Sequence, residues 1–138
     1  MPDKDIRWIQ RFNNYKKALA RLTEAVDMDL DAMNDLEMNG LIQRFEFTFE
    51  LAWKTLWDLL KYKGHSQLPD TVAVVLNLAI DEGWLNDAEN WKKMRQSRNQ
   101  TSHTYNEGTA NEIATATVEI YHALFIQLET RLEVERLG

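Results

Sequence analysis

The sequence contains no cysteine, and only two prolines and five glycines occur among its 138 residues. Without cysteine, the chain has neither a disulfide framework nor a thiolate metal site. Its longest apolar run, residues 72–76 (VAVVL), is far too short to span a bilayer, and its first ten residues lack the apolar segment of a signal peptide. We therefore expect a cytoplasmic protein that does not enter the membrane.

Basic residues are in the minority, because the chain carries a net charge of −6. This charge argues against a general nucleic-acid coat protein, which needs a basic surface. The distribution is uneven, since residues 90–106 hold four basic residues and no acidic one, so this window is +4 and the remainder is −10. An anion could bind at the window although the whole molecule repels polyanions.

Hydrophobic residues, in contrast, make up 44% of the chain, with five tryptophans, and they recur with helical periodicity. A chain of this length fits one domain, residues 1–138, with its own core. Gly64 and Gly83 are expected to end two of the helices. The predicted helices lie near 4–26, near 37–63, from Pro69 to Gly83, from about Asn86 towards residue 97, and near 110–136.

These segments predict an all-α, up-and-down four-helix bundle with an additional short helix. Strand signals are weak, and no hairpin turn pair is present. The apolar stripe of the last helix is expected to comprise Ile113, Ile120, Leu124, Leu128 and Leu132. Trp8, Trp57 and Trp84 are hard to place on one narrow core stripe, so we expect aromatic surface to remain for a partner, and we expect a homodimer.

The chain also lacks residues at the spacing of a metal-binding motif. The aspartates at residues 27–31 occupy the first three ligand positions of a calcium loop, but Ala32 stands where glycine is needed and Met38 where a bidentate glutamate is needed. His65 and His122 have no ligand spacing. No Walker loop or dinucleotide-binding glycine turn occurs, so we expect no metal and no cofactor.

One polar stretch, residues 97–108 (SRNQTSHTYNEG), differs from the helical packing around it. On a straight helix Arg98 and His103 would point about 140° apart, so they can meet on one phosphate only if the helix ends between them or if two chains combine. An imidazole can exchange a proton with ribose oxygens, and a guanidinium can hold phosphate oxygens, so the pair could cut RNA without metal. The alternative is a helix cap with a surface ion pair, and a Tyr105 that simply packs.

A second stretch, residues 44–60 (RFEFTFELAWKTLWDLL), places Glu46 and Glu50 on the flank of a strongly apolar helix. These carboxylates could form a solvated face in which Glu50 pairs with Lys54. Alternatively, one of them crosses the bundle and orients Arg98 or His103. The residues alone leave both interpretations open.

The run from Arg98 to Tyr105 resembles the R-x4-H-x-Y motif of HEPN domains. With FEFTFELAWKTL before it at this distance, nearly the whole chain resembles the nucleotidyltransferase substrate-binding protein family within that group. The resemblance implies a bundle of four long helices, usually dimeric, that works with a separate minimal nucleotidyltransferase. Members with the intact motif resemble the toxin ribonucleases of toxin–antitoxin pairs.

The resemblance also implies roles for single residues. Arg98 and His103 would be catalytic, and Asn99 and Ser102 would shape the pocket. Tyr105 matches the tyrosine to which the partner transferase adds AMP. A bulky anion beside the catalytic pair would then block RNA and silence the enzyme.

Three hypotheses follow. The first is a metal-independent endoribonuclease whose cleft lies between two copies of the chain. The second is a non-catalytic subunit that binds a nucleotide or substrate for the nucleotidyltransferase. The third is a purely structural helical bundle without a ligand.

Overall fold

The computed structural model describes the backbone of residues 2–138 and the side chains from residue 6 onward. Within that range every regular element is a helix, which confirms the predicted all-α bundle. The elements are α1 (Pro2–Val26), η1 (Leu30–Ala32), α2 (Asp35–Tyr62), α3 (Val72–Asp81), α4 (Ala88–Asn99), η2 (Thr101–His103), α5 (Glu107–Ala116), η3 (Thr117–Tyr121) and α6 (His122–Leu137). None of the described helices is long and apolar enough to cross a membrane.

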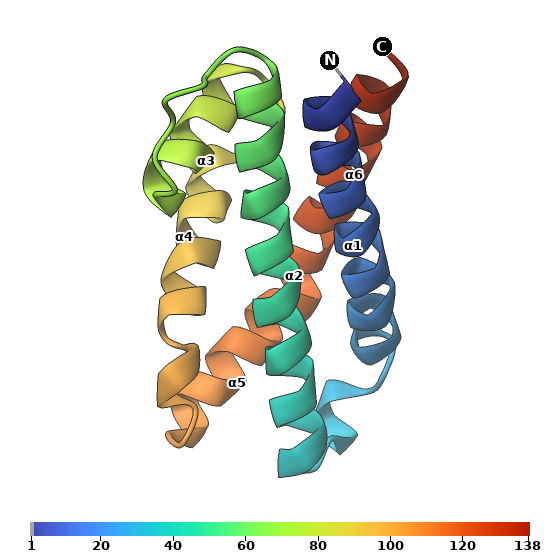
Figure 1. Cartoon of the computed structure of the whole chain (residues 1–138). Coiled ribbons are helices and arrows are strands. Elements are labelled where there is room, and N and C mark those ends of the chain that lie inside the picture. Colours follow the sequence, from blue (N-terminus) through green and yellow to red (C-terminus); the bar gives the residue numbers. More distant parts are fainter. Residues whose placement is uncertain (1) are drawn as a thin grey trace.

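The central helix of the bundle is α2, which packs along α1 over most of its length (Figure 1). On one side α6 packs against α1, and on the other side α4 runs along α2, with the short α3 beside the upper half of α2. The two chain ends lie together at the top, and the turn that follows α4 lies at the opposite end (Figure 1). The polar stretch at residues 97–108 is therefore remote from both ends of the chain.

An aromatic cluster fills the core, and Phe125 lies at its centre. Its ring lies 6.2 Å from that of Phe45 and 5.9 Å from that of Trp91, and its backbone carbonyl accepts a 2.7 Å hydrogen bond from the Tyr15 hydroxyl. The Phe45 ring also stacks on Tyr121 at 5.4 Å. Residues from α1, α2, α4 and the last helix thus meet at one point, and burial of these large apolar surfaces stabilises the bundle.

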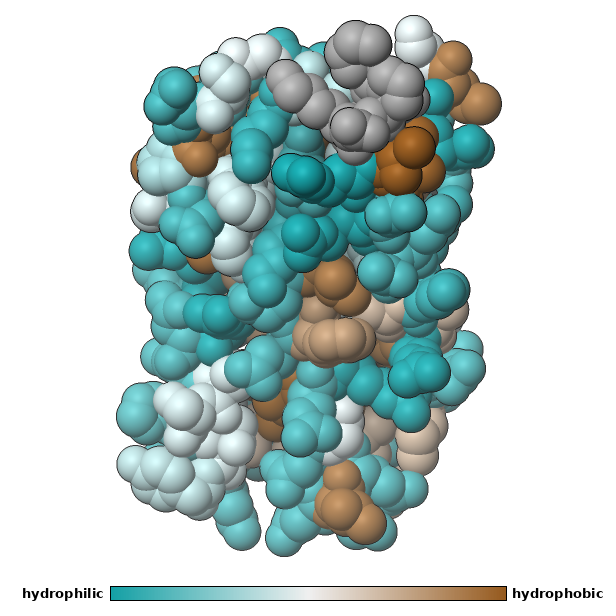
Figure 2. Space-filling model, viewed as in Figure 1, coloured by the Kyte–Doolittle hydropathy of each residue, from teal (hydrophilic) through white to brown (hydrophobic). Residues whose placement is uncertain are grey.

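The prediction that Trp8, Trp57 and Trp84 leave aromatic surface exposed is wrong for Trp8 and Trp84. Trp8 and Trp84 are buried, at 1% and 4% exposure, because neighbouring helices cover the ends of the core as well as its middle. Trp57 is half-buried, and its indole nitrogen donates to the Leu68 carbonyl at 3.2 Å. The large aromatic side chains that are exposed are instead Phe47 and Tyr105. On the face seen in Figure 2, hydrophobic residues form small separate patches within a mostly hydrophilic surface.

Local sequence signals explain most helix ends. A capping box between Asn34 and Glu37 starts α2 two residues before the predicted position. Gly64 (φ 120°) and Gly83 (φ 81°) adopt the left-handed conformation that glycine allows, so both are helix stops as expected. The third helix begins at Val72, after Thr71 as its N-cap, and not at Pro69.

The last helix departs from its predicted apolar stripe, because residues 117–121 form the π-helical turn η3. Ile113, Thr117 and Tyr121 are buried at spacings of four, whereas Ile120, expected in the core, is 37% exposed. An α-helix turns 40° too far for a spacing of four, and the wider π turn absorbs that excess. Within this turn the Tyr121 hydroxyl forms a 2.7 Å hydrogen bond with Ser97 on α4. Burial raises the pKa of Tyr121 above its ordinary value.

At the start of α6, His122 makes a polar contact with α1. Its Nε2 lies 2.8 Å from the Thr23 hydroxyl, which itself donates to the Leu19 carbonyl at 2.9 Å. Because the hydroxyl proton is used in that bond, the hydroxyl accepts from a neutral imidazole protonated at Nε2. Burial lowers the pKa of His122 below its ordinary value of 6.5, and the nearby Asp27 opposes this in part.

We expect the free energy of unfolding to decrease as the pH is lowered below about 6.5. A His122→Gln variant should show a smaller decrease over the same pH range. In that range the unfolded chain protonates His122 while the folded chain resists protonation, so acid favours unfolding. Urea unfolding of both proteins at pH 7.5 and 5.5 measures the difference, and carboxylates common to both cancel. Equal losses in the two proteins would contradict the assignment.

Candidate functional site at the end of α4

The polar stretch folds as a helix end and not as a continuous helix. α4 stops at Asn99, the short helix η2 covers Thr101–His103, and α5 begins at Glu107. Asn106 caps α5, with its side-chain oxygen accepting from the backbone of Gly108 at 2.9 Å. The helix therefore ends between Arg98 and His103, which is the first of the two conditions under which they could act on one phosphate.

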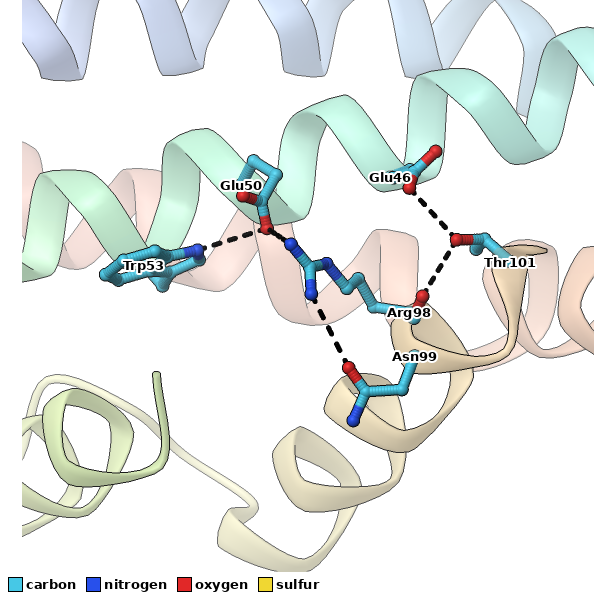
Figure 3. Close-up of polar contacts among 6 residues, drawn as sticks. All are labelled: Glu46, Glu50, Trp53, Arg98, Asn99 and Thr101. Carbon is cyan, nitrogen blue, oxygen red and sulfur yellow. Dashed lines mark hydrogen bonds and ion pairs between the residues drawn. The ribbon is translucent and has the colours of Figure 1, made fainter. Parts of the chain in front are cut away.

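Arg98 is held from α2 by an ion pair. Its Nη2 lies 2.5 Å from Glu50 Oε2, and the Trp53 indole nitrogen donates to the same oxygen at 3.1 Å (Figure 3). The two side chains are only 32% and 25% exposed, so water screens this pair less than an ordinary surface pair. A long contact of 3.5 Å joins Arg98 Nη1 to Asn99 on its own helix. The guanidinium thus has a defined position.

Glu46 supports the backbone of the turn. The Thr101 hydroxyl lies 3.0 Å from Glu46 Oε2 and 2.8 Å from the Arg98 carbonyl oxygen (Figure 3), and it can donate its one proton to either. Glu46 and Glu50 of α2 therefore both contact the segment that carries the motif. Of the two interpretations that the sequence left open, the structure has the one in which Glu50 crosses to Arg98, and not the pair with Lys54.

His103 and Tyr105 lie on the outside of the turn. His103 is exposed, and Tyr105 is 84% exposed, so the interpretation of Tyr105 as a packed residue does not hold. Their rings lie 6.1 Å apart, nearly edge to face. Asn99 and Ser102 are exposed beside them. Among the described residues, no hydrogen bond or ion pair joins Arg98 to His103, so neither side chain positions the other through a polar contact.

Two contributors to this arrangement have no role in the sequence-based prediction. Trp53 follows Glu50 by three residues, a spacing that places both on one helix face, and this spacing is a usable signal. Thr101 gave no such signal, because its contacts depend on where α4 ends.

The fold and the motif define the chain as a HEPN-like helical bundle. Residues 10–134 match the family described as "Nucleotidyltransferase substrate binding protein like". The chain belongs to this family, which confirms the resemblance seen in the two sequence blocks.

Two relatives, both from Haemophilus influenzae, are similar to this chain. One is described as "Probable ribonuclease HepT" and is 32% identical over 89 residues, which cover 61% of this chain and 60% of that protein. The matched part is thus less than two thirds of either. The other is a solved structure described as revealing the fold of a substrate binding domain of a nucleotidyltransferase. It shares the fold, with a TM-score of 0.63, 23% identity, and coverage of 94% of this chain and 98% of that one.

Proposed function

We propose that this protein is a metal-independent endoribonuclease that uses Arg98 and His103 and works with a separate nucleotidyltransferase. The observation that supports the proposal most is the arrangement of the turn after α4. An arginine held in place by Glu50 and an exposed histidine lie at its two ends, within five residues of each other. The similarity to a protein described as a probable ribonuclease points the same way.

The reaction is a transesterification. His103 takes the proton of a ribose 2′-hydroxyl, and the 2′-oxygen attacks the neighbouring phosphorus. The bond from phosphorus to the 5′-oxygen breaks, and that oxygen leaves with a proton. The products are a 2′,3′-cyclic phosphate and a 5′-hydroxyl. Arg98 binds the two phosphate oxygens, on which negative charge increases in the transition state.

A second copy of the chain completes this reaction in the proposal. One imidazole does not readily remove one proton and supply another at the same time. A homodimer that turns two copies of the segment towards each other supplies one histidine as base and one as acid. The exposure of His103 in the single chain leaves it available for such a cleft.

Tyr105 is the proposed site of control. Its hydroxyl would attack the α-phosphorus of ATP bound to the nucleotidyltransferase, lose its proton and release pyrophosphate, which leaves AMP on the tyrosine oxygen. The exposure of its ring is consistent with this reaction. The added phosphate would lie beside the His103 ring, where it repels the RNA backbone, and the added nucleoside would occupy the space above the turn.

The experiment is RNA cleavage in EDTA by the purified protein and by a His103→Ala variant. Both are made without the transferase, so that Tyr105 stays unmodified. We expect the wild-type protein to release products ending in a cyclic phosphate, and the variant to lose this activity while it remains folded and dimeric. Absence of cleavage by an intact wild-type dimer would contradict the enzyme proposal.

A second candidate function, a non-catalytic substrate-binding subunit, is favoured by the family description. In this case the protein binds a nucleotide or the transferase, and His103→Ala leaves that binding largely unchanged. Binding of the transferase to both variants, without cleavage by either, would support this function.

A further inference from the structure

An open pocket of about 560 Å³ lies beside Arg98, over the outer face of α2. Arg98 lines it from α4, Arg21 lines it from α1, and Gln43, Arg44 and Phe47 line it from α2. Its volume lies within the range of about 300–1,000 Å³ that is common for small-molecule pockets. The pocket therefore has room for a ligand that also reaches the Arg98 guanidinium.

Phe47 gives this pocket an aromatic wall. It lies between Phe45 and Phe49, which are fully buried, but the turn of the helix points Phe47 outward and leaves it 59% exposed. A single exposed phenylalanine is common on protein surfaces and carries little meaning by itself. Here the ring is part of a hollow that also contains guanidinium groups. Aromatic rings beside basic groups bind single-stranded nucleic acid, because each base stacks on a ring and each phosphate pairs with a cation.

The charges of the pocket favour phosphate. Arg44 is positioned by a 2.7 Å hydrogen bond from its Nη1 to the Arg21 carbonyl oxygen. Its ion pair with Glu24 is long, at 3.5 Å, and the Glu24 side chain is 74% exposed, so this pair is weak and leaves Arg44 able to bind an anion. Two carboxylates, Glu46 and Glu50, also line the pocket, so its three arginines leave a net charge of +1. The charge of Glu50 is offset by its ion pair with Arg98.

The other large hollow differs in charge. It measures about 730 Å³, lies beside Tyr105, and is lined by Asp31, Asp35 and Glu107 without any basic side chain. Carboxylates at such a surface repel phosphate. A nucleic-acid strand that reaches the turn after α4 is therefore expected to approach over Phe47 and Arg44, and not over the acidic hollow.

We propose that the pocket binds one nucleotide of a single-stranded RNA. The base stacks on Phe47, and the adjoining phosphate is held by Arg44 on the side away from Arg98. This inference rests on the proposed function and adds to it the residues that bind the strand. Phe47 and Arg44 are binding residues in this scheme and take no part in proton transfer.

The test is binding of a fluorescent 2′-O-methyl oligonucleotide, followed by anisotropy. This probe has no free 2′-hydroxyl and is not cut, so binding is measured whether or not the protein is a ribonuclease. We expect Phe47→Leu, which keeps the apolar bulk but removes the ring, to raise Kd by about 5- to 150-fold. Phe47→Trp should bind as the wild type does. Leu36→Ala, an exposed apolar change on the same helix, is the matched control.

The phosphate contact has its own measurement. Arg44→Gln should weaken binding and reduce the slope of log Kd against log salt concentration by about one. Arg136→Gln, at an exposed arginine on α6, should change neither. A slope that stays the same in Arg44→Gln would overturn the phosphate assignment.

Three results would overturn the proposal as a whole. The first is a wild-type protein that does not bind the probe, and the second is Phe47→Leu binding as the wild type does. The third is a change of Phe47→Leu to a smaller assembly in light scattering, because this face would then be a contact between copies of the chain.

Phe47-dependent binding without cleavage would keep the pocket and reject the ribonuclease. Cleavage that depends on His103, together with probe binding that is unchanged in Phe47→Leu, would support the ribonuclease and reject the pocket. Displacement of the probe by ATP at equal concentration would identify a free nucleotide as the ligand and overturn the RNA assignment.

Discussion

Replacing Arg98 with alanine is expected to lower kcat/KM for RNA cleavage by about 100- to 1,000-fold, which is the usual loss when a group that stabilises transition-state charge is removed. The guanidinium is fixed by Glu50 and Trp53 before substrate arrives, so little ordering is needed at the moment of reaction. Arg98→Lys is expected to recover only a small part of the loss, because an ammonium group cannot contact Glu50 and two phosphate oxygens in one plane. Single-turnover cleavage of a short RNA measures both effects.

Arg95→Ala is the matched control for Arg98, because it removes the same charge from the same helix three residues earlier. It should leave kcat/KM within a few-fold of wild type. An equal loss in the two variants would assign the effect to general attraction of RNA by this helix. Full activity of Arg98→Ala would reject the proposed catalytic role of Arg98. Far-UV circular dichroism of each variant establishes that the bundle is retained.

A Phe125→Ala variant is expected to lose about 3–5 kcal/mol of folding free energy, the usual range for removal of a buried phenylalanine. The ring is fully buried among Tyr15, Phe45 and Trp91, and these partners come from three other helices and cannot all move in to fill the space. Because whole domains are stable by only about 5–15 kcal/mol, this loss is a large share of the total. Urea unfolding monitored by tryptophan fluorescence measures it.

Phe47→Ala is the control for Phe125→Ala, since it makes the same chemical change at a side chain that is 59% exposed. Its expected effect is within about 0.5 kcal/mol. A loss at Phe47 as large as that at Phe125 would contradict the exposed position of Phe47. A loss below 1 kcal/mol at Phe125 would contradict the central position of its ring in the core.

The sequence was a good guide to features that depend on neighbouring residues. Helix positions follow from apolar periodicity, and Gly64 and Gly83 end helices because their backbones adopt positive φ. Asn106 caps α5 through a contact with residues only two and three positions later. Each of these signals acts within a few residues and needs no knowledge of the partner helix.

Features that depend on residues far apart in the sequence could not be predicted from local signals. Glu50 had a local partner at Lys54 and a distant one at Arg98, and only the packing of α4 on α2 decides between them. The burial of Trp8 and Trp84 depends equally on helices that cover the ends of the core. The outward position of Ile120 follows from the π turn η3. A search for α-helical periodicity assumes a regular α-helix and does not detect such a turn.

The π turn at residues 117–121 has a consequence for how this protein tolerates length changes. A π turn takes up one extra residue without changing the direction in which the following helix faces. Loss of one residue from this turn would therefore leave an ordinary α-helical turn, with Phe125, Leu128 and Leu132 still facing the core. We therefore expect homologous chains to differ in length by one residue at this segment without loss of the core contacts of α6. Longer insertions and deletions should fall instead in the connection between α2 and α3, which contains no helix.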